Sequence, residues 1–125
     1  MKVLAVVEDD PDVAFLVETI FSMDSRFTVA AVADSAEQAL TTAPSKEPET
    51  IMLDHGLAGV LTGLEAAPKL NQLVPRSKII LFTTQAELEA RAQEEPAIDA
   101  FLLKTESTRL LALAQELTGL RALSG

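Results

Sequence analysis

The sequence predicts one α/β domain in which a mostly parallel, doubly wound sheet carries helices on both faces. Short apolar runs alternate along the chain with segments whose apolar residues recur at helical spacing. The runs are almost unbroken, as expected for strands buried on both faces of a parallel sheet. The length of 125 residues suits one domain, and neither an internal repeat nor a linker is visible. We therefore expect residues 1–125 to form a single domain of five strands and five helices.

The first strand and helix are marked by a change from apolar to acidic residues. Lys2–Val7 (KVLAVV) predicts a buried strand, and three acids followed by Pro11 end it. Acids and proline both favour the first turn of a helix. Apolar residues at helical spacing then predict a helix over roughly Asp12–Met23. The run FTVAAVA predicts the second strand, Phe27–Ala33.

The second helix is predicted to be short. Asp34 or Ser35 is a suitable cap, and Glu37 lies in the capping-box neighbourhood. Proline removes a hydrogen bond inside a helix, so we expect this helix to end before Pro44. The polar segment 43–49 then predicts a surface loop.

The third strand is predicted at Thr50–Leu53 (TIML), with Asp54 at its carboxyl end. A loop over His55–Thr62 contains two glycines and precedes a helix at about Gly63–Leu73. Pro68 lies inside that helix, and we expect it to delay or kink the start.

The last third of the chain predicts two more strands and two more helices. KIILF predicts a strand at Lys78–Phe82, and DAFLL predicts another at Asp99–Leu103. The Glu-rich segment Glu87–Glu94 predicts an exposed helix. Leucines on one side of Glu106–Leu120 predict a long final helix.

Charge and composition exclude several classes of function. A net charge of −9 opposes contact with nucleic acid or an anionic membrane surface. Because the chain has no Cys, disulfides, thiolate metal sites and Cys nucleophiles are excluded. No secretory signal is visible, and no apolar run approaches the ~20 residues of a membrane span. We therefore expect a cytoplasmic protein that binds no nucleic acid and inserts into no membrane.

Polar residues with complementary chemistry follow the predicted strands, at Glu8, Asp9, Asp10, Asp54, Thr83 and Lys104. Ligands of open parallel sheets bind outside the carboxyl ends of the strands. Clustered carboxylates repel one another unless a cation is present, and Mg²⁺ prefers a few carboxylates together with water and phosphate oxygens. A lysine and a threonine beside such an ion can hold phosphoryl oxygens. The predicted chemistry is attack by a carboxylate on phosphorus, which gives an acyl phosphate.

Four segments resemble the receiver domains of bacterial two-component response regulators, chemotaxis-type receivers included. They are VVEDDPDV (Val6–Val13), MLDHGL (Met52–Leu57), IILFT (Ile79–Thr83) and AFLLK (Ala100–Lys104). The resemblance covers nearly the whole chain, with the segments in the family's order. It implies a flavodoxin-like (βα)5 three-layer sandwich whose five-stranded parallel sheet has the order 2-1-3-4-5.

The resemblance also implies a phosphoacceptor and a metal site. Asp54 corresponds to the residue that is phosphorylated, which makes the chain a phosphoprotein of a phosphorelay. Glu8, Asp9 and Asp54, together with the carbonyl of Gly56, would bind Mg²⁺. Such a domain catalyses only its own phosphorylation and dephosphorylation and is no enzyme in the usual sense.

Three further residues have roles implied by the same resemblance. Thr83 and Lys104 would bind the phosphoryl oxygens beside Asp54, and Thr83 and Phe101 would form a conformational switch. The implied partners are a sensor histidine kinase or phosphotransfer protein and a downstream protein target. With no effector domain after residue 125, we expect a stand-alone receiver that acts by protein binding, as a monomer or a phosphorylation-linked dimer.

The chain departs from the family's usual pattern at five positions. Ala58 stands where proline is usual, and Gly63 lies one residue later than expected, which implies an insertion after the third strand. Thr84 replaces a smaller alanine, Thr105 replaces a proline that often follows a cis peptide bond, and Ala97 replaces glycine. These changes affect the expected switching more than the expected phosphorylation.

Simpler interpretations stay open at this point. The acids after the first strand could merely complement a helix dipole, Lys104 could pair with Glu106, and Phe101 could be an ordinary core residue. His55, the only histidine, is interpreted as a loop side chain that either faces solvent or flanks the site, and not as a metal ligand or base. Two other functions remain possible: a receiver-like interaction module that works without phosphorylation, and a flavodoxin-like enzyme or electron carrier. The acidic first loop disfavours the second of these because a flavin phosphate needs N–H donors there.

Overall fold

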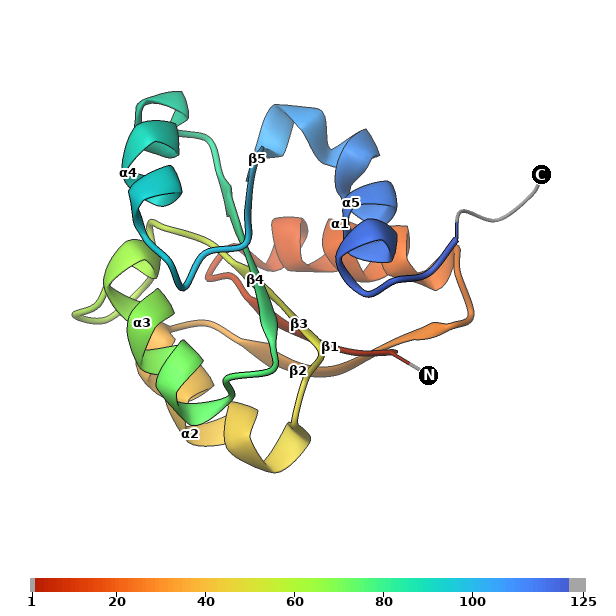
Figure 1. Cartoon of the computed structure of the whole chain (residues 1–125), viewed down its shortest axis with the longest axis horizontal. Coiled ribbons are helices and arrows are strands. Elements are labelled where there is room, and N and C mark those ends of the chain that lie inside the picture. The colour runs from red at the N-terminus through yellow and green to blue at the C-terminus, as the bar shows by residue number, and fades with distance from the viewer. Residues whose placement is uncertain (1, 122–125) are drawn as a thin grey trace.

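Five parallel strands form one sheet in the order β2-β1-β3-β4-β5 in a computed structural model of the chain, which describes residues 2–121 (Figure 1). The strands are β1 (Lys2–Val7), β2 (Phe27–Ala33), β3 (Thr50–Leu53), β4 (Lys78–Thr83) and β5 (Ala100–Leu103). The helices are α1 (Pro11–Ser22), α2 (Ala36–Lys46), α3 (Gly63–Leu73), α4 (Glu89–Glu94) and α5 (Leu110–Leu117). The predicted fold class and strand order are confirmed.

The helices form two layers with a separate apolar core on each face of the sheet. α1 and α5 lie together on one face, and α2, α3 and α4 cover the other (Figure 1). Side chains alternate along β1, so that Leu4 and Val6 join the α1–α5 core while Ala5 and Val7 join the opposite core. Both sets are buried, which explains why the strands read as unbroken apolar runs.

The two helical prolines do not act as the sequence predicts. α2 continues past Pro44 to Lys46, and Glu47 then ends it in the left-handed conformation with φ 46°. α3 begins at Gly63 with a complete capping box, so Pro68 does not delay its start. Each proline costs one helical hydrogen bond, but buried alanines on the sheet side keep both helices in place.

The last two helices are shorter than predicted because both begin as 3₁₀ turns. The segment predicted as Glu87–Glu94 is a 3₁₀ turn, η1 (Ala86–Leu88), followed by α4. The final helix is preceded by a longer turn, η2 (Lys104–Arg109), and ends at Leu117. Glu106 has non-helical angles of φ −107° and ψ 27°, which place a kink within η2.

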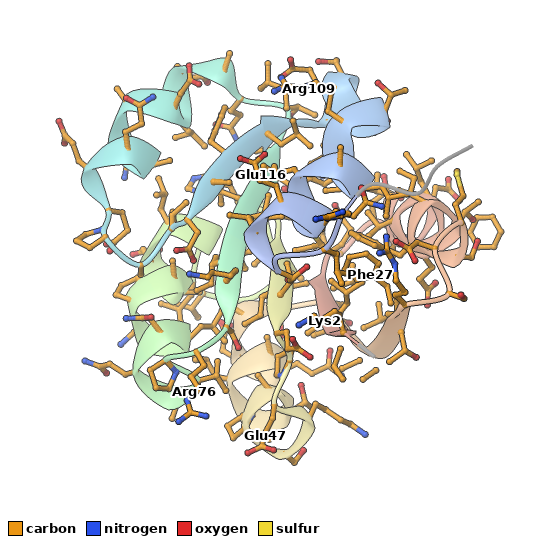
Figure 2. All side chains as sticks on the ribbon, turned by 45° about the vertical axis from the view of Figure 1, so that its right-hand side comes forward. Lys2, Phe27, Glu47, Arg76, Arg109 and Glu116 are labelled. Carbon is orange, nitrogen blue, oxygen red and sulfur yellow. The ribbon has the colours of Figure 1, made fainter. Side chains whose placement is uncertain are left out.

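The two ends of the sheet differ in what lies on them. In Figure 2, Glu47 and Arg76 lie at the lower edge, before β3 and β4, and Arg109 lies at the upper edge, after β5. A groove of about 430 Å³ opens at the lower edge, between the loops that lead into β3 and β4.

None of the helices in the described part of the chain is long and apolar enough to cross a membrane.

An ion pair in the α1–β2 turn, between the buried Asp24 and the partly exposed Arg26, is hydrogen-bonded to α5 and to Arg121. Asp24 is 1% exposed and accepts hydrogen bonds from the Arg26 guanidinium and from the Gln115 amide on α5. Arg26 also donates to the carbonyl of Arg121 at 2.7 Å. The Arg26 hydrogen bonds hold the pKa of Asp24 well below its usual range, although burial opposes them.

Candidate metal and phosphoryl site

Three carboxylates meet at the carboxyl ends of β1 and β3. These strands are neighbours, and Val7 pairs with Leu53 in the parallel register. The residues that follow the pair are therefore brought side by side. One carboxylate oxygen from each of Glu8, Asp9 and Asp54 lies within 4.8 Å of the others. Glu8 and Asp54 are buried and Asp9 is exposed, so the cluster has one open side.

Lys104 brings a positive charge to this cluster from the end of β5. Its ammonium lies 2.7 Å from Glu8 Oε1 and 3.2 Å from Asp54 Oδ2. Because β4 separates β5 from β3 in the sheet, the Lys104 side chain crosses the end of β4 to reach them. The alternative pairing with Glu106 is wrong, since Glu106 binds Arg109 at 3.0 Å.

The cluster carries more negative than positive formal charge. Burial is the largest effect on Glu8 and, together with the nearby Asp54 carboxylate, raises its pKa to about 7. The Lys104 contact acts in the opposite direction and lowers this pKa. Burial lowers the pKa of Lys104, but its two acidic neighbours outweigh burial and raise it overall. Three carboxylates face one ammonium, which leaves two formal negative charges in a partly buried site.

The donor set fits a hard divalent cation. Glu8 Oε1 is buried and has no hydrogen-bond donor directed at it. Its close partner is the Lys104 ammonium at 2.7 Å, and since a carboxylate oxygen has two lone pairs, one contact leaves the other available to a cation. Carboxylate oxygens with room for water and phosphate oxygens are what Mg²⁺ prefers. A groove of about 620 Å³ opens beside Glu8 and Asp9, between α1 and the end of β2.

Asp54 itself is held rigidly. Its N–H donates to the carbonyl of Val7 at 3.0 Å, and its Oδ1 accepts from the N–H of His55 at 2.8 Å. The Nδ1 of His55 accepts from the N–H of Leu64 at 3.4 Å, at the start of α3. Burial, with a smaller effect of Arg91, lowers the pKa of His55 and so favours the neutral acceptor. His55 thus flanks the site as the sequence predicts.

Asp10 stands apart from the cluster. It is the N-cap of α1, where its carboxylate accepts from the N–H of Asp12 at 2.9 Å. The dipole interpretation of the acids after β1 is therefore right for Asp10 alone. Glu8 and Asp9 belong to the carboxylate cluster instead.

Thr83 and Phe101 lie on neighbouring strands near this edge. Thr83 is 1% exposed, and its hydroxyl oxygen accepts from the N–H of Gln85 at 3.2 Å. Phe101 pairs with Leu81 in the sheet and packs, half-buried, against the α2–α4 core. Their role as a switch stays a prediction, and so does the role of the Gly56 carbonyl. The Lys104–Thr105 peptide is trans, as are the other described peptide bonds.

Glu37 is the residue near the site whose role the sequence does not reveal. Ser35, one of the two caps predicted from the sequence, does cap α2, but Glu37 takes no part in a capping box. The Glu37 carboxylate instead reaches the loop after Asp54 and accepts from the N–H groups of Val60 and Leu61. No local spacing signals this contact, since 23 residues separate Glu37 from Val60.

Comparison with known proteins gives one family. The sequence model described as "Response regulator receiver domain" matches residues 4–115. The nitrate/nitrite response regulator protein NarL of Escherichia coli is 29% identical over 124 residues, covering 97% of this chain and 57% of NarL. A relative from Pseudomonas aeruginosa is 31% identical over 116 residues, covering 91% of this chain and 55% of the relative. The chain thus spans about half the length of these curated relatives.

Solved structures share the fold. The response regulator TrrA of Thermotoga maritima, in complex with Mg²⁺ and BeF, superposes with a TM-score of 0.83 at 24% identity, covering 94% of this chain and 99% of TrrA. A LuxR-family DNA-binding response regulator of Staphylococcus aureus gives 0.83 at 22% identity, covering 94% and 98%. At these identities the likeness concerns the fold.

Proposed function

Because the chain belongs to the response regulator receiver family, a family of two-component signalling domains, we propose that Asp54 accepts a phosphoryl group in a magnesium-dependent reaction. One observation supports this most directly: the Asp54 carboxylate lies within 4.8 Å of those of Glu8 and Asp9 and 3.2 Å from the Lys104 ammonium. Receiver domains are signalling domains and not classical enzymes.

The chain's own residues supply most of the proposed chemistry. A carboxylate oxygen of Asp54 attacks phosphorus, the bond from phosphorus to the donor breaks, and its electron pair leaves with the donor. The product is an acyl phosphate on Asp54. The fixed backbone of Asp54 holds the nucleophile in place, which lowers the entropic cost of reaction.

Glu8, Asp9 and Lys104 would manage the charge. Glu8 and Asp9 would hold the Mg²⁺, with the Gly56 carbonyl as a further ligand. When bound, the ion supplies positive charge that offsets repulsion between an anionic nucleophile and an anionic donor. The Lys104 ammonium is near any group joined to Asp54 Oδ2 and would stabilise charge on the transferring oxygens, together with the Thr83 hydroxyl.

Partners follow from this role. The proposed donor is a histidine kinase or a phosphotransfer protein, since receiver domains interact with kinases. The proposed output is binding of a downstream protein. The net charge of −9 favours partners with basic surfaces.

The phosphoacceptor is tested by intact mass after incubation with acetyl phosphate and Mg²⁺. Wild type should gain one phosphoryl group, labile to hydroxylamine, and Asp54→Asn should gain none. Asp10→Asn is the matched control, because Asp10 caps α1 outside the cluster, and it should still be modified. Labelling of Asp54→Asn at the wild-type rate would place the phosphoacceptor elsewhere. If no donor modifies the wild type, the module works without phosphorylation.

The metal is tested by thermal unfolding across a Mg²⁺ titration. A ligand that binds only the folded state at ten times its Kd stabilises that state by about 1.4 kcal/mol. Glu8→Gln and Asp9→Asn should each weaken this effect, whereas the exposed Asp12→Asn should not. An unchanged melting temperature together with no heat of binding in calorimetry would refute the metal site.

A further inference from the structure

Hydrogen bonds hold the loop between Asp54 and α3, residues 55–62, at two places: where its two ends meet, and at Val60 and Leu61. At the base, the N–H of Gly63 donates to the carbonyl of His55 at 3.0 Å, which closes the loop beneath the site. Before α3, Glu65 accepts from the N–H of Thr62 at 3.0 Å, and a side chain from α2 holds the two residues before Thr62. The stretch between these two places contains Gly56, the proposed carbonyl ligand.

That side chain is Glu37, in the first turn of α2. Its Oε1 accepts from the N–H of Val60 at 2.8 Å and from the N–H of Leu61 at 3.2 Å. These hydrogen bonds lower the pKa of the Glu37 carboxyl, and the position at the start of a helix also favours a negative charge. Charge-assisted hydrogen bonds of this kind are the stronger ones.

The loop backbone is shaped to receive the carboxylate. Gly59 has φ 92°, a conformation that residues with a side chain rarely adopt. A Cβ at Gly59 would lie 2.8 Å from Glu37 Oε1, so the carboxylate occupies the space that a side chain would take. A bridge between Ser35 and Ala58 joins the same two segments. Both the start of α2 and the loop after Asp54 therefore have conformations that favour this contact.

We propose that Glu37 is a positioning residue for the metal site, because its carboxylate fixes the course of the 55–62 loop and thereby the placement of Gly56. This inference rests on the proposed function for its consequence but not for the contact itself. The path of the loop through Gly56 is held locally by the N–H of Leu57, which donates to the carbonyl of His55 at 3.1 Å, and by the bridge at Ala58. The Glu37 contact adds a hold on the Val60–Leu61 backbone, which follows this stretch. Removal of the carboxylate leaves both N–H groups without their acceptor and takes away one of the contacts that hold this stretch in place.

The size of the effect is bounded by comparison with groups that contact metal ligands directly. Loss of such a partner costs about 10–100-fold in metal affinity. Glu37 acts through several loop residues, so we expect Glu37→Ala to weaken Mg²⁺ binding about 3- to 10-fold, at or below the lower end of that range. Glu37→Gln keeps one acceptor oxygen and should restore most of the affinity.

Calorimetric titration with Mg²⁺ and amide NMR of the metal-free protein together test the proposal. Val60→Ala is the matched control, because its side chain is 88% exposed and its N–H is kept. Glu37→Ala should weaken Mg²⁺ binding and shift the amide signals of His55 and Gly56, and Val60→Ala should do neither. Glu37→Gln should resemble wild type.

The outcomes separate this proposal from the function on which it rests. Unshifted His55 and Gly56 signals in Glu37→Ala, or unchanged Mg²⁺ affinity in a wild type that binds the ion, would overturn the positioning role. Equal losses in Glu37→Ala and Val60→Ala would also overturn it, since they indicate a general loosening of the loop. If wild type binds no Mg²⁺, the proposed function fails, and the NMR comparison still decides whether Glu37 positions the loop.

Discussion

Gly63→Ala should disturb the phosphoacceptor more than its conservative chemistry suggests. A Cβ at Gly63 would lie 2.2 Å from the carbonyl oxygen of Asp54 and 2.9 Å from Cα of His55. Ordinary contact begins near 3.4 Å, so the backbone at Asp54 or the start of α3 must move by more than 1 Å. Both partners are backbone atoms, which no side-chain rotation can clear.

The structure sets the scale of both consequences. Overpacking of this kind costs typically about 1–3 kcal/mol of folding stability, and a misplacement of about 1 Å at a reacting group costs about 100-fold in rate. We therefore expect Gly63→Ala to lose about 2 kcal/mol of stability and to accept phosphoryl groups from acetyl phosphate about 100-fold more slowly.

Urea unfolding and time-resolved intact mass measure these two quantities. Gly56→Ala is the control for stability, because its Cβ would meet nothing within 4 Å, and it should not lower the free energy of unfolding. The reasoning is wrong if Gly63→Ala keeps both the stability and the phosphorylation rate of wild type. A stable protein with a slow rate would mean that the strain is released at Asp54 and not in α3.

Two further predictions concern acid stability and switching. The pKa of Asp24 is lower in the folded chain than in the unfolded chain. The ionised Asp24 therefore contributes its full stabilisation above the unfolded-state pKa of about 4, and this stabilisation is lost as the pH falls toward the folded-state pKa. Asp24→Asn should therefore destabilise the protein at neutral pH and flatten its acid unfolding, and an unchanged acid profile would contradict the Asp24–Arg26 pairing. Beryllofluoride should shift amide NMR signals of Thr83 and Phe101 as well as Asp54, because a phosphoryl analogue selects among existing conformations. Shifts confined to the acidic pocket would exclude the switch.

The sequence predicts the fold well because the fold depends on short-range patterns. Buried parallel strands need unbroken apolar runs, and β1 through β5 fall within a residue of the predicted ranges. Helix ends are harder to predict, because tertiary packing overrides local preference. Pro44 shows this: the buried Ala39 and Ala43 hold α2 against the sheet just before a residue that usually ends a helix, and the helix continues for two more residues to Lys46.

The candidate site likewise has a part that the sequence predicts and a part that it does not. The cluster of Glu8, Asp9, Asp54 and Lys104 is predictable, since the ends of parallel strands gather at one edge of the sheet. Glu37 is not, because its partners are two backbone N–H groups that any sequence offers. Helix caps also bind backbone, but their partners lie two or three residues away and so leave a local pattern, whereas the partners of Glu37 lie 23 and 24 residues away.

The placement of Thr83 suggests how an event at Asp54 reaches the protein surface. Its hydroxyl oxygen is the acceptor for the N–H of Gln85, immediately before η1. If the Thr83 side chain moves toward a phosphoryl oxygen and donates to it, we expect the 3.2 Å hydrogen bond from Gln85 to lengthen, which loosens one of the contacts at the start of η1. Only Leu88 and Ala92 are buried between residues 86 and 94. A segment with so few buried contacts opens at low cost, so we predict that phosphorylation of Asp54 displaces the exposed face formed by η1 and α4.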